Sequence, residues 1–423
     1  MFGNVNSKII EITIYCLISL AIFITIGENL IDYYRFFFLK TLLILIILTQ
    51  INFIQETKAQ IKINSVISII ILLFIISVSA SYIISPYDLS YFAYEWLRVR
   101  YIHILSDIFL FICLYFYFKK KDINYKFLTK SIIIPGIIFV VFLLIVMIFN
   151  KKITNDNQYI IFFDGTRQVG ILITFLISFY LGCKINKYFS QNTLISVLIT
   201  SLYLTLAIFL WGRGSLLSIL ITYLFVFFTI HILKKDLKKE FLILVISLIL
   251  AFSLSYSLSL LIVSDESLKK VLIRDDIIRD NQNLGNIRLF MWEYSLNNFF
   301  ENPLFGKGPG SFYISTFNEM ISGKLHYLYV HTQPHNLFFQ FIFEWGLIGS
   351  SLLLFLFLKL FLISSKQLFK NKNSILLIPG LGIISLTIHS MVDGSFFHPT
   401  FTFYIVVCLS VLCSEINKIN HRL

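Results

Sequence analysis

The 423-residue sequence is poor in charge, since only 14% of its residues are Asp, Glu, Lys or Arg. Soluble globular proteins carry roughly 25% charged residues, so the composition excludes that class. Hydrophobic residues make up 57% of the chain, and they gather in blocks of about 17 to 25 residues, the length at which an α-helix crosses the hydrocarbon core of a membrane. The sequence therefore predicts an all-α integral membrane protein that crosses the membrane many times.

Cysteine and paired acidic residues are also scarce. The five cysteines lie in or beside apolar blocks without CxxC or Cys/His spacing, which argues against a disulfide framework and a zinc site. No two acidic residues stand two positions apart, so the Asp-x-Asp arrangement that holds a divalent ion against a sugar nucleotide is missing. His331 and His335 have a helical metal-ligand spacing, but Pro334 between them opposes a regular helix. We therefore expect no metal and no cofactor.

Nucleotide and nucleic-acid binding find no support either. The glycines of GKGPG (306–310) form a GxGxG, yet no strand precedes them and Lys307 is followed by glycine rather than Ser or Thr, which excludes a Rossmann or P-loop motif. The formal net charge is +12, but Lys and Arg lie in short loops and not on a basic domain with stacking aromatic residues. They are better explained as signals of membrane topology.

Twelve apolar segments can be placed along the chain. They begin near residues 9, 37, 64, 101, 131, 169, 193, 215, 241, 337, 374 and 399. An even number puts both termini on one side of the membrane, and basic residues accumulate in short cytoplasmic loops. The side of the termini carries 19 Lys and Arg, against 7 in the short loops of the other side, so both termini are predicted to be cytoplasmic. The first segment lacks a cleavage site of the A-x-A type and is expected to remain as a helix.

One connection is long. It runs from Ser264 to His335, 72 residues, between the ninth and tenth segments on the outer face, and a loop of this length usually has a function. Within it, Arg288 to Phe300 is apolar and aromatic at helical spacing, which suits a helix along the membrane interface. The following GKGPGSF is typical of turns. The predicted organisation is residues 1–263 with helices one to nine, 264–336 as the outer loop, and 337–423 with helices ten to twelve.

The histidines indicate that a site, if present, lies on the outer face. Under this topology His231 and His421 lie inside, and the other six lie at or near the outer face: His103, His326, His331, His335, His389 and His398. The central parts of the segments are nearly free of charge. This distribution favours surface chemistry over a transport path through the membrane.

The strongest local pattern is HTQPHNLFFQFIFEWGLIG, which leads from the loop into the tenth segment. Pro334 favours a helix start, with His335 and Asn336 at its cap. Gly346 and Gly349 follow on one helical face, and small residues so spaced let another helix approach closely. His335 can be an interfacial aromatic that only bonds the helix end, or it can be a catalytic group.

Two arginines are expected on the same face. Arg213 lies between glycines in the tight turn LWGRGSLLSIL, where its guanidinium would be accessible, although an arginine that snorkels from a helix end is the commoner use. Arg288 opens the stretch RLFMWEY, where a solvated arginine would be the default. Guanidinium groups bind phosphate bidentately, and an imidazole can take a proton from an attacking hydroxyl. The combination suggests transfer to a hydroxyl with a phosphate leaving group, such as a lipid-linked pyrophosphate sugar donor supplies.

These residues resemble the O-antigen ligase family. Its Arg-x3-Leu motif corresponds to Arg213 and Leu217, and its His-[Asn/Ser/Gln]-x9-Gly-x2-[Gly/Thr/Tyr] motif corresponds to the stretch from His335 to Gly349. The twelve-segment layout and the long loop agree with the family along nearly the whole chain. The resemblance implies a GT-C-like membrane glycosyltransferase of the bacterial inner membrane. Such an enzyme would move a glycan from undecaprenyl diphosphate to an acceptor hydroxyl on the periplasmic face, with inversion and without metal or cofactor.

The resemblance also implies roles for individual residues. His335 would be the catalytic base, and Arg213 and Arg288 the diphosphate clamp. Asp393, in IHSMVDGSFFHP, resembles an acidic position near the outer end of the eleventh helix of relatives. Supporting roles are expected for Asn336, Asp393, His389 and Arg167.

The resemblance does not decide which molecule accepts the glycan. Ligases that load lipid A-core, O-antigen polymerases that extend a lipid-linked glycan, and protein O-oligosaccharyltransferases share one donor, and motifs share mechanisms more readily than substrates. The complete second motif and the single large loop favour the ligase. A transporter of lipid-linked glycans is the alternative from another class. The expected partners are the undecaprenyl diphosphate-linked donor, a glycan or lipid A-core acceptor and membrane lipids, without nucleic acid.

Overall fold

The computed structural model describes residues 2–24, 30–49, 65–85, 91–149, 166–189, 192–210, 213–233, 235–262, 275–324, 333–371, 374–394 and 398–422, and no strand occurs among them. Their elements are α1 (Phe2–Ile24), α2 (Leu30–Leu48), α4 (Ser65–Ile84), α5 (Tyr91–Lys120), α6 (Tyr125–Phe149), α7 (Thr166–Ile185), α8 (Thr193–Phe209), α9 (Arg213–Ile232), α10 (Leu237–Ile262), α12 (Asp275–Glu301), α13 (Ser311–Ile321), α14 (Leu337–Asn371), the 3-10 helix η5 (Ser374–Leu376), α15 (Leu377–Asp393) and α16 (Pro399–Arg422).

The twelve predicted apolar segments correspond in chain order to α1, α2, α4 to α10 and α14 to α16. Among the described residues, seven helices are long and apolar enough to cross a membrane, and they lie in α5, α6, α9, α10, α14, α15 and α16. Shorter apolar helices lie in α4, α7 and α8. The predicted all-α fold is confirmed and suits a multi-pass membrane protein, whereas the number of twelve crossings stays a prediction.

Several helices begin earlier than the sequence predicted. For example, α2 begins at Leu30 rather than near residue 37, and α5 begins at Tyr91 rather than near 101. Hydropathy marks only the apolar part of a helix, while helical hydrogen bonding continues into its polar ends. In α5 the polar end is stabilised by an ion pair one turn apart, in which the Arg98 Nη2 lies 2.7 Å from the Glu95 Oε2.

The side chains of the bundle are arranged for apolar surroundings. Large apolar residues face outward, among them Ile83, whose side chain is 79% exposed, as expected of helices surrounded by lipid. Many hydroxyl groups inside the helices donate to carbonyl oxygens of the preceding turn: Thr174 Oγ1 donates to Gly170 at 2.8 Å and Ser178 Oγ donates to Thr174 at 2.7 Å. A buried polar group without a partner would be costly in a membrane.

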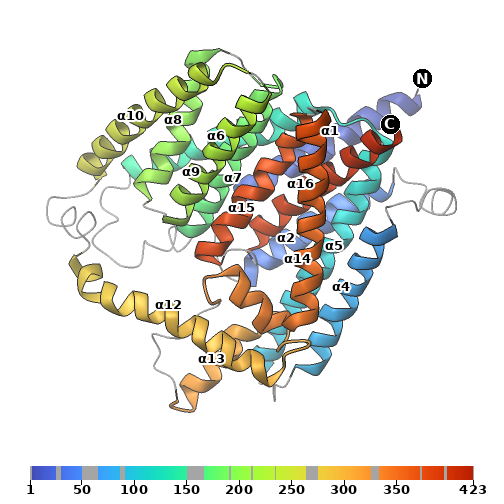
Figure 1. The fold of residues 1–423 in the computed structure, drawn as a ribbon, viewed down its shortest axis with the longest axis vertical. Coiled ribbons are helices and arrows are strands. Elements are labelled where there is room, and N and C mark those ends of the chain that lie inside the picture. The colour runs from blue at the N-terminus through green and yellow to red at the C-terminus, as the bar shows by residue number, and fades with distance from the viewer. Residues whose placement is uncertain are drawn as a thin grey trace.

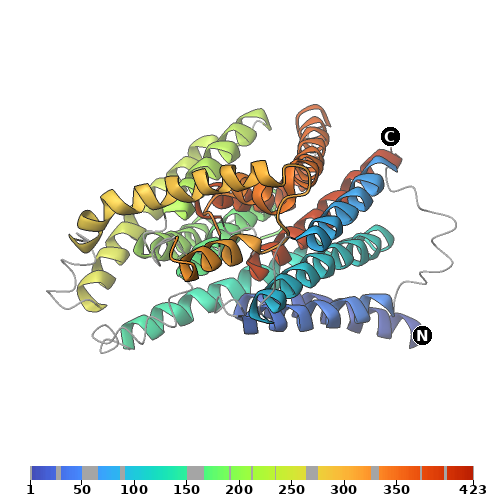
Figure 2. The ribbon, with the colours of Figure 1, turned by 90° about the horizontal axis from the view of Figure 1, so that it is seen from below.

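The two ends of the bundle differ. The N-terminal end of α1 and the C-terminal end of α16 lie at one end, and α12 and α13 lie at the other (Figure 1). Figure 2 shows α12 lying across this second end, with α13 beside it. In the interior α7 packs against α15, while α5 packs against α16 and α4 against α14. We refer to the end that carries α12 and α13 as the α12–α13 end.

The predicted helix from Arg288 to Phe300 is confirmed as part of the longer α12. The turns predicted from GKGPGSF are present up to Gly310, but α13 begins at Ser311 and was not predicted. Gly310 precedes it with φ of 77°, a left-handed conformation that glycine adopts without steric cost. A helix of 11 residues leaves only a weak periodic signal in a sequence so rich in aromatic residues.

α14 is broken at Gly346, whose φ and ψ are 61° and −164°. The break frees main-chain groups, and the segment after α12 pairs with them. The carbonyl oxygens of Phe343 and Glu344 accept from the N–H groups of Lys307 and Gly308, both at 2.9 Å. On the other side of the break, the N–H groups of 347 and 348 donate to the carbonyl oxygens of 303 and 304 at 2.8 and 3.1 Å. The turn segment is therefore fixed on α14 by four main-chain hydrogen bonds.

The roles predicted for the two motif glycines need correction. Gly349 does lie close to a neighbouring helix, since a Cβ there would be 3.2 Å from the Ser77 Oγ of α4. Gly346 instead contacts the turn segment, because a Cβ on it would be 2.5 Å from the Gly306 nitrogen. The sequence could not distinguish a close helix from a close loop, since both require a small residue.

We expect Gly346→Ala to destabilise the protein by roughly 3 kcal/mol or more, because alanine would combine an unfavourable positive φ with a main-chain clash. The melting temperature of the detergent-purified protein measures this loss. Gly380→Ala is the matched control, since a Cβ at Gly380 in α15 would meet no atom within 4 Å. Equal melting temperatures for the two variants would contradict the role assigned to the break.

Candidate active site

His335 lies where three parts of the chain meet at the α12–α13 end. Its φ of 54° is left-handed, which is uncommon for a residue other than glycine. From α12, the Trp292 Nε1 donates to the Pro334 carbonyl oxygen at 3.0 Å, and the Trp292 ring stacks on Phe339 of α14 with centroids 5.2 Å apart. After α15, a Cβ on Gly394 would come within 2.6 Å of the His335 Cα. These contacts hold the His335 backbone in its unusual conformation.

Asn336 caps α14, as the sequence predicted. Its Oδ1 accepts from the N–H groups of Phe338 at 2.9 Å and Phe339 at 3.4 Å, the pattern of a helix N-cap. Its Nδ2 donates to the Met391 carbonyl oxygen of α15 at 2.9 Å. Asn336 therefore positions the start of α14 against the end of α15, beside His335.

The ring of His335 is oriented by the main chain of Asp393. The His335 Nδ1 lies 3.3 Å from the Asp393 carbonyl oxygen, and a carbonyl oxygen only accepts. In the neutral imidazole Nδ1 therefore carries the hydrogen, and Nε2 carries the lone pair. With His335 only 4% exposed, this arrangement gives a fixed tautomer of the kind a general base requires.

The Asp393 carboxylate lies between two basic side chains. The Arg288 Nη2 donates to Oδ1 at 3.4 Å, and the His389 Nε2 lies 3.6 Å from Oδ2. The Arg288 side chain is 41% exposed, whereas that of Asp393 is 12% exposed. A guanidinium has five N–H donors, so Arg288 can be held by Asp393 and still bind a ligand at the surface.

His389 is fully buried one turn before Asp393 and is held by α7. The Thr174 Oγ1 lies 3.2 Å from the His389 Nδ1 and donates its hydrogen to the Gly170 carbonyl oxygen at 2.8 Å. Since the hydroxyl has a single hydrogen, His389 Nδ1 is the donor to Thr174. Thr174 thus fixes the His389 ring with its Nε2 facing Asp393, and this Nε2 carries a hydrogen toward the carboxylate only when the imidazole is protonated. Sequence reasoning missed Thr174, because nothing in the apolar stretch ILITFLIS marks it.

The side chains of Arg213 and Arg167 lie outside the described part of the structure, so their roles stay predictions. Their backbones begin α9 and α7. A Cβ on Gly214, next to Arg213, would be 3.2 Å from the Asp393 Oδ2 and 3.5 Å from the His389 Nε2. The first turn of α9 therefore lies against Asp393, where its N–H groups also favour an anion.

The other predicted histidines do not join this cluster in the described structure. His326 and His331 lie outside the described residues, and the His398 Nε2 lies 3.5 Å from the Gln333 Nε2. Within the described ranges, no three His, Cys, Asp or Glu residues lie together so that they could hold a metal ion. Chemistry without a metal stays a prediction.

The structure thus brings together five of the seven predicted site residues, namely His335, Asn336, Arg288, His389 and Asp393.

Comparison with known families adds an independent finding: residues 195–354 match the model of the family described as O-antigen ligase. The match runs from α8 into α14 and includes Arg213, Arg288 and His335. No curated protein matches the chain. With helices that can cross a membrane, this match supports a membrane glycosyltransferase of the ligase or polymerase type. Residues 195–354 of the chain are therefore similar to the O-antigen ligase family.

Proposed function

We propose that the protein is an O-antigen ligase-like glycosyltransferase that moves a glycan from undecaprenyl diphosphate to a hydroxyl of lipid A-core on the periplasmic face. The observation that supports this function is the meeting of His335, Arg288 and Asp393, from three distant parts of the chain, at one end of the bundle. A base beside a partly exposed arginine suits the transfer of a group from a diphosphate to a hydroxyl.

In the proposed reaction, the acceptor oxygen attacks the anomeric carbon of the glycan while the bond from that carbon to the diphosphate oxygen breaks. Attack from the face opposite the leaving group inverts the anomeric centre. The His335 Nε2 takes the hydroxyl proton, and the Asp393 carbonyl oxygen that accepts from Nδ1 stabilises the imidazolium that forms. The electron pair of the broken bond leaves with the diphosphate.

The leaving diphosphate gains negative charge and needs cationic partners. Arg288 would bind it through donors that Asp393 does not occupy, and Arg213 would approach it from the first turn of α9. His389 and Asn336 act through their neighbours: His389 supports the Asp393 carboxylate and Asn336 fixes the start of α14. Arg167, in the first turn of α7, is a further candidate for the diphosphate. Metal and cofactor have no role in this scheme.

The proposed location is the bacterial inner membrane, with a GT-C-like arrangement and the α12–α13 end in the periplasm. Both termini would be cytoplasmic. Two observations support this orientation: the termini lie at the end opposite α12 and α13 (Figure 1), and the side of the termini carries 19 basic residues against 7 in the short loops of the other side.

Lipopolysaccharide banding in a strain deleted for this gene tests the proposal. We expect core lipid without glycan and an accumulation of long lipid-linked chains, both reversed by the wild-type gene. Core lipid bearing a single repeat would instead indicate a polymerase. An unchanged banding pattern would contradict both and favour protein glycosylation or transport. The purified protein separates these last two classes, because a transferase releases undecaprenyl diphosphate from the donor and a transporter does not.

A further inference from the structure

Two histidines of the chain each precede an aspartate by four residues on one helix. They are His103 with Asp107 on α5, and His389 with Asp393 on α15. Both histidines are buried in the bundle. The pair on α15 belongs to the candidate site, whereas the pair on α5 faces Lys40 of α2. The two pairs share their spacing but differ in how the histidine ring is held.

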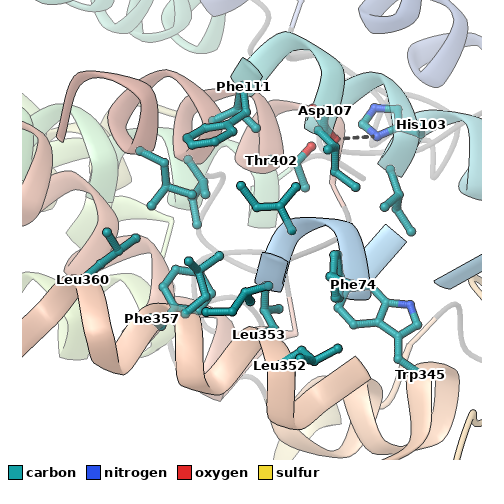
Figure 3. Close-up of a pocket in the computed structure, with 18 of the residues that line it drawn as sticks. Phe74, His103, Asp107, Phe111, Trp345, Leu352, Leu353, Phe357, Leu360 and Thr402 are labelled. Carbon is teal, nitrogen blue, oxygen red and sulfur yellow. Dashed lines mark ion pairs between the residues drawn. The ribbon is translucent and has the colours of Figure 1, made fainter. Parts of the chain in front are cut away.

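In the pair on α5, a neutral histidine satisfies its neighbours. The His103 Nδ1 lies 3.0 Å from the Asp107 Oδ2, as the dashed line in Figure 3 marks, and the Lys40 Nζ lies 2.6 Å from the Asp107 Oδ1. The Lys40 Nζ also lies 3.0 Å from the His103 Nε2. An ammonium group only donates, so Nε2 accepts from it while Nδ1 carries a hydrogen toward Asp107. Lys40 supplies the positive charge here.

His389 is held the other way round. Its Nδ1 donates to Thr174, so Nε2 is the nitrogen that faces Asp393, 3.6 Å from Oδ2. Nε2 is buried and has no hydrogen-bond partner among the described residues. In a neutral imidazole it would carry a lone pair, which repels the carboxylate oxygen in front of it. A hydrogen on Nε2 removes this repulsion, and a buried charge is tolerated when it is paired with an opposite one.

Asp393 is the carboxylate that His389 faces. The Arg288 guanidinium of α12 approaches Asp393 through its other oxygen, Oδ1. Glu344 and Glu415 lie deeper in the bundle, roughly 10 and 24 Å along α14 and α16 from the starts of these helices. The other polar or charged groups at this end are Thr174 of α7, Ser215 of α9, His335 before α14, and Arg167 and Arg213 in the first turns of α7 and α9, whose side chains lie outside the described residues.

The charge of His389 matters for a diphosphate at Arg288. The charges of Arg288 and Asp393 cancel, so this pair alone attracts an anion weakly. An imidazolium at position 389 adds a positive charge and shares the Asp393 carboxylate, which leaves more of the Arg288 guanidinium to the ligand. Such a charge acts strongly because the surroundings of a buried group screen it less than water does.

We propose that His389 is a protonated positioning residue, whose hydrogen on Nε2 offsets the charge of Asp393 and turns Arg288 to the diphosphate. The inference rests on the proposed function and adds a condition for its donor site. His389 loses this hydrogen as the pH rises, so transfer has an upper pH limit set by His389 and a lower limit set by His335. The profile of kcat/KM for the donor against pH is therefore bell-shaped.

His389→Gln separates charge from structure, because glutamine keeps an N–H donor for Asp393 but carries no charge. We expect this variant to lower kcat/KM for the undecaprenyl donor about tenfold at neutral pH, since one nearby positive charge contributes at least this much in a partly buried site. The fall toward alkaline pH should be lost as well. Persistence of the alkaline fall in His389→Gln would overturn the proposal.

Thr174→Val is a second variant, because valine has the shape of threonine but cannot accept from the His389 Nδ1. The imidazolium then lacks one partner, so the alkaline fall should begin at lower pH. Thr222→Val is the matched control: the buried Thr222 Oγ1 donates to the Ser218 carbonyl oxygen at 2.7 Å, and it lies roughly 12 Å along α9 from Gly214. Equal pH profiles for the two valine variants, at equal melting temperatures, would contradict the fixed ring on which the proposal depends.

The hydrogen on His389 can also be observed without glycan transfer. The 15N spectrum of histidine rings distinguishes an imidazolium, in which both nitrogens carry hydrogen, from a neutral ring. For the detergent-purified protein near neutral pH, we expect an imidazolium signal that disappears in His389→Gln, whereas the signal that disappears in His103→Gln should be that of a neutral ring. A neutral His389 would overturn the proposal, whether or not the protein transfers glycan.

Binding of inorganic pyrophosphate tests the link from His389 to the ligand. Relative to His389→Gln, the wild type should bind pyrophosphate about tenfold more tightly at neutral pH, and this advantage should vanish over the pH range in which the His389 signal becomes neutral. Equal binding by the two proteins at every pH would overturn the proposal. A protein that shows the advantage but transfers no glycan would support the role of His389 and contradict the proposed function.

Discussion

Replacing His335 by alanine is expected to lower the rate of glycan transfer by about 10²- to 10⁴-fold, because a positioned general base contributes this much. The side chain that takes the proton of the acceptor hydroxyl would be lost, while the arginines that bind the diphosphate would remain. The loss should therefore appear in kcat more than in KM for the donor. Release of undecaprenyl diphosphate by the purified protein measures the rate.

The left-handed backbone of His335, with φ of 54°, decides the choice of control. Alanine is strained in this conformation, but asparagine adopts it readily. His335→Asn also keeps an N–H donor for the Asp393 carbonyl oxygen and cannot act as a base. We expect this variant to have the melting temperature of the wild type and the low activity of His335→Ala. His231→Asn, at an exposed position in the last turn of α9, should keep full activity.

The pH dependence gives a second measure of the same role. The transfer rate of the wild type should fall toward acid pH, because a protonated imidazole has no lone pair to accept the hydroxyl proton. The residual rate of His335→Asn should lack this fall. Activity of His335→Asn equal to that of the wild type would show that His335 only bonds the end of α14.

Much of the helical framework could be predicted from the sequence. Hydropathy placed all twelve apolar helices in order, and the aromatic stretch from Arg288 to Phe300 was recognised as helical. These features depend on residues close together in the chain. The break at Gly346 could not be predicted, because it arises from main-chain pairing with the distant segment around Gly306.

For the candidate site, too, only the features that depend on residues close together in the sequence could be predicted. The local signals at Pro334 and Asn336 were enough to place the start of α14. By contrast, the contact between His335 and the Asp393 carbonyl oxygen joins residues 58 positions apart, and that between Thr174 and His389 joins residues 215 apart. A single sequence names candidates by residue type but does not say which backbone group orients which ring.

The second large effect is expected for Arg288→Lys. Lysine keeps the positive charge but loses the planar fork that binds two phosphate oxygens at once, and it has fewer donors to share between Asp393 and a ligand. Loss of one preorganised donor to a developing charge costs about 10²-fold or more. We therefore expect kcat/KM for the undecaprenyl donor to fall by about 10²-fold, with an unchanged melting temperature. Steady-state kinetics of the purified variant measure the fall.

The pair formed by Arg288 and Asp393 makes this prediction specific. Arg98→Lys is the matched control, because the Arg98 side chain is 45% exposed and pairs with Glu95 on its own helix, and it should retain the wild-type rate.

Asp393→Asn should also lower the rate, since it releases Arg288 and removes the partner of His389. If Arg288 acts through its pairing with Asp393, the double variant should lose less than the product of the two single losses, because contacting residues are not additive. Wild-type kinetics for Arg288→Lys would mean instead that Arg288 is a solvated surface arginine and that the diphosphate is bound elsewhere, with the first turn of α9 as the next place to examine.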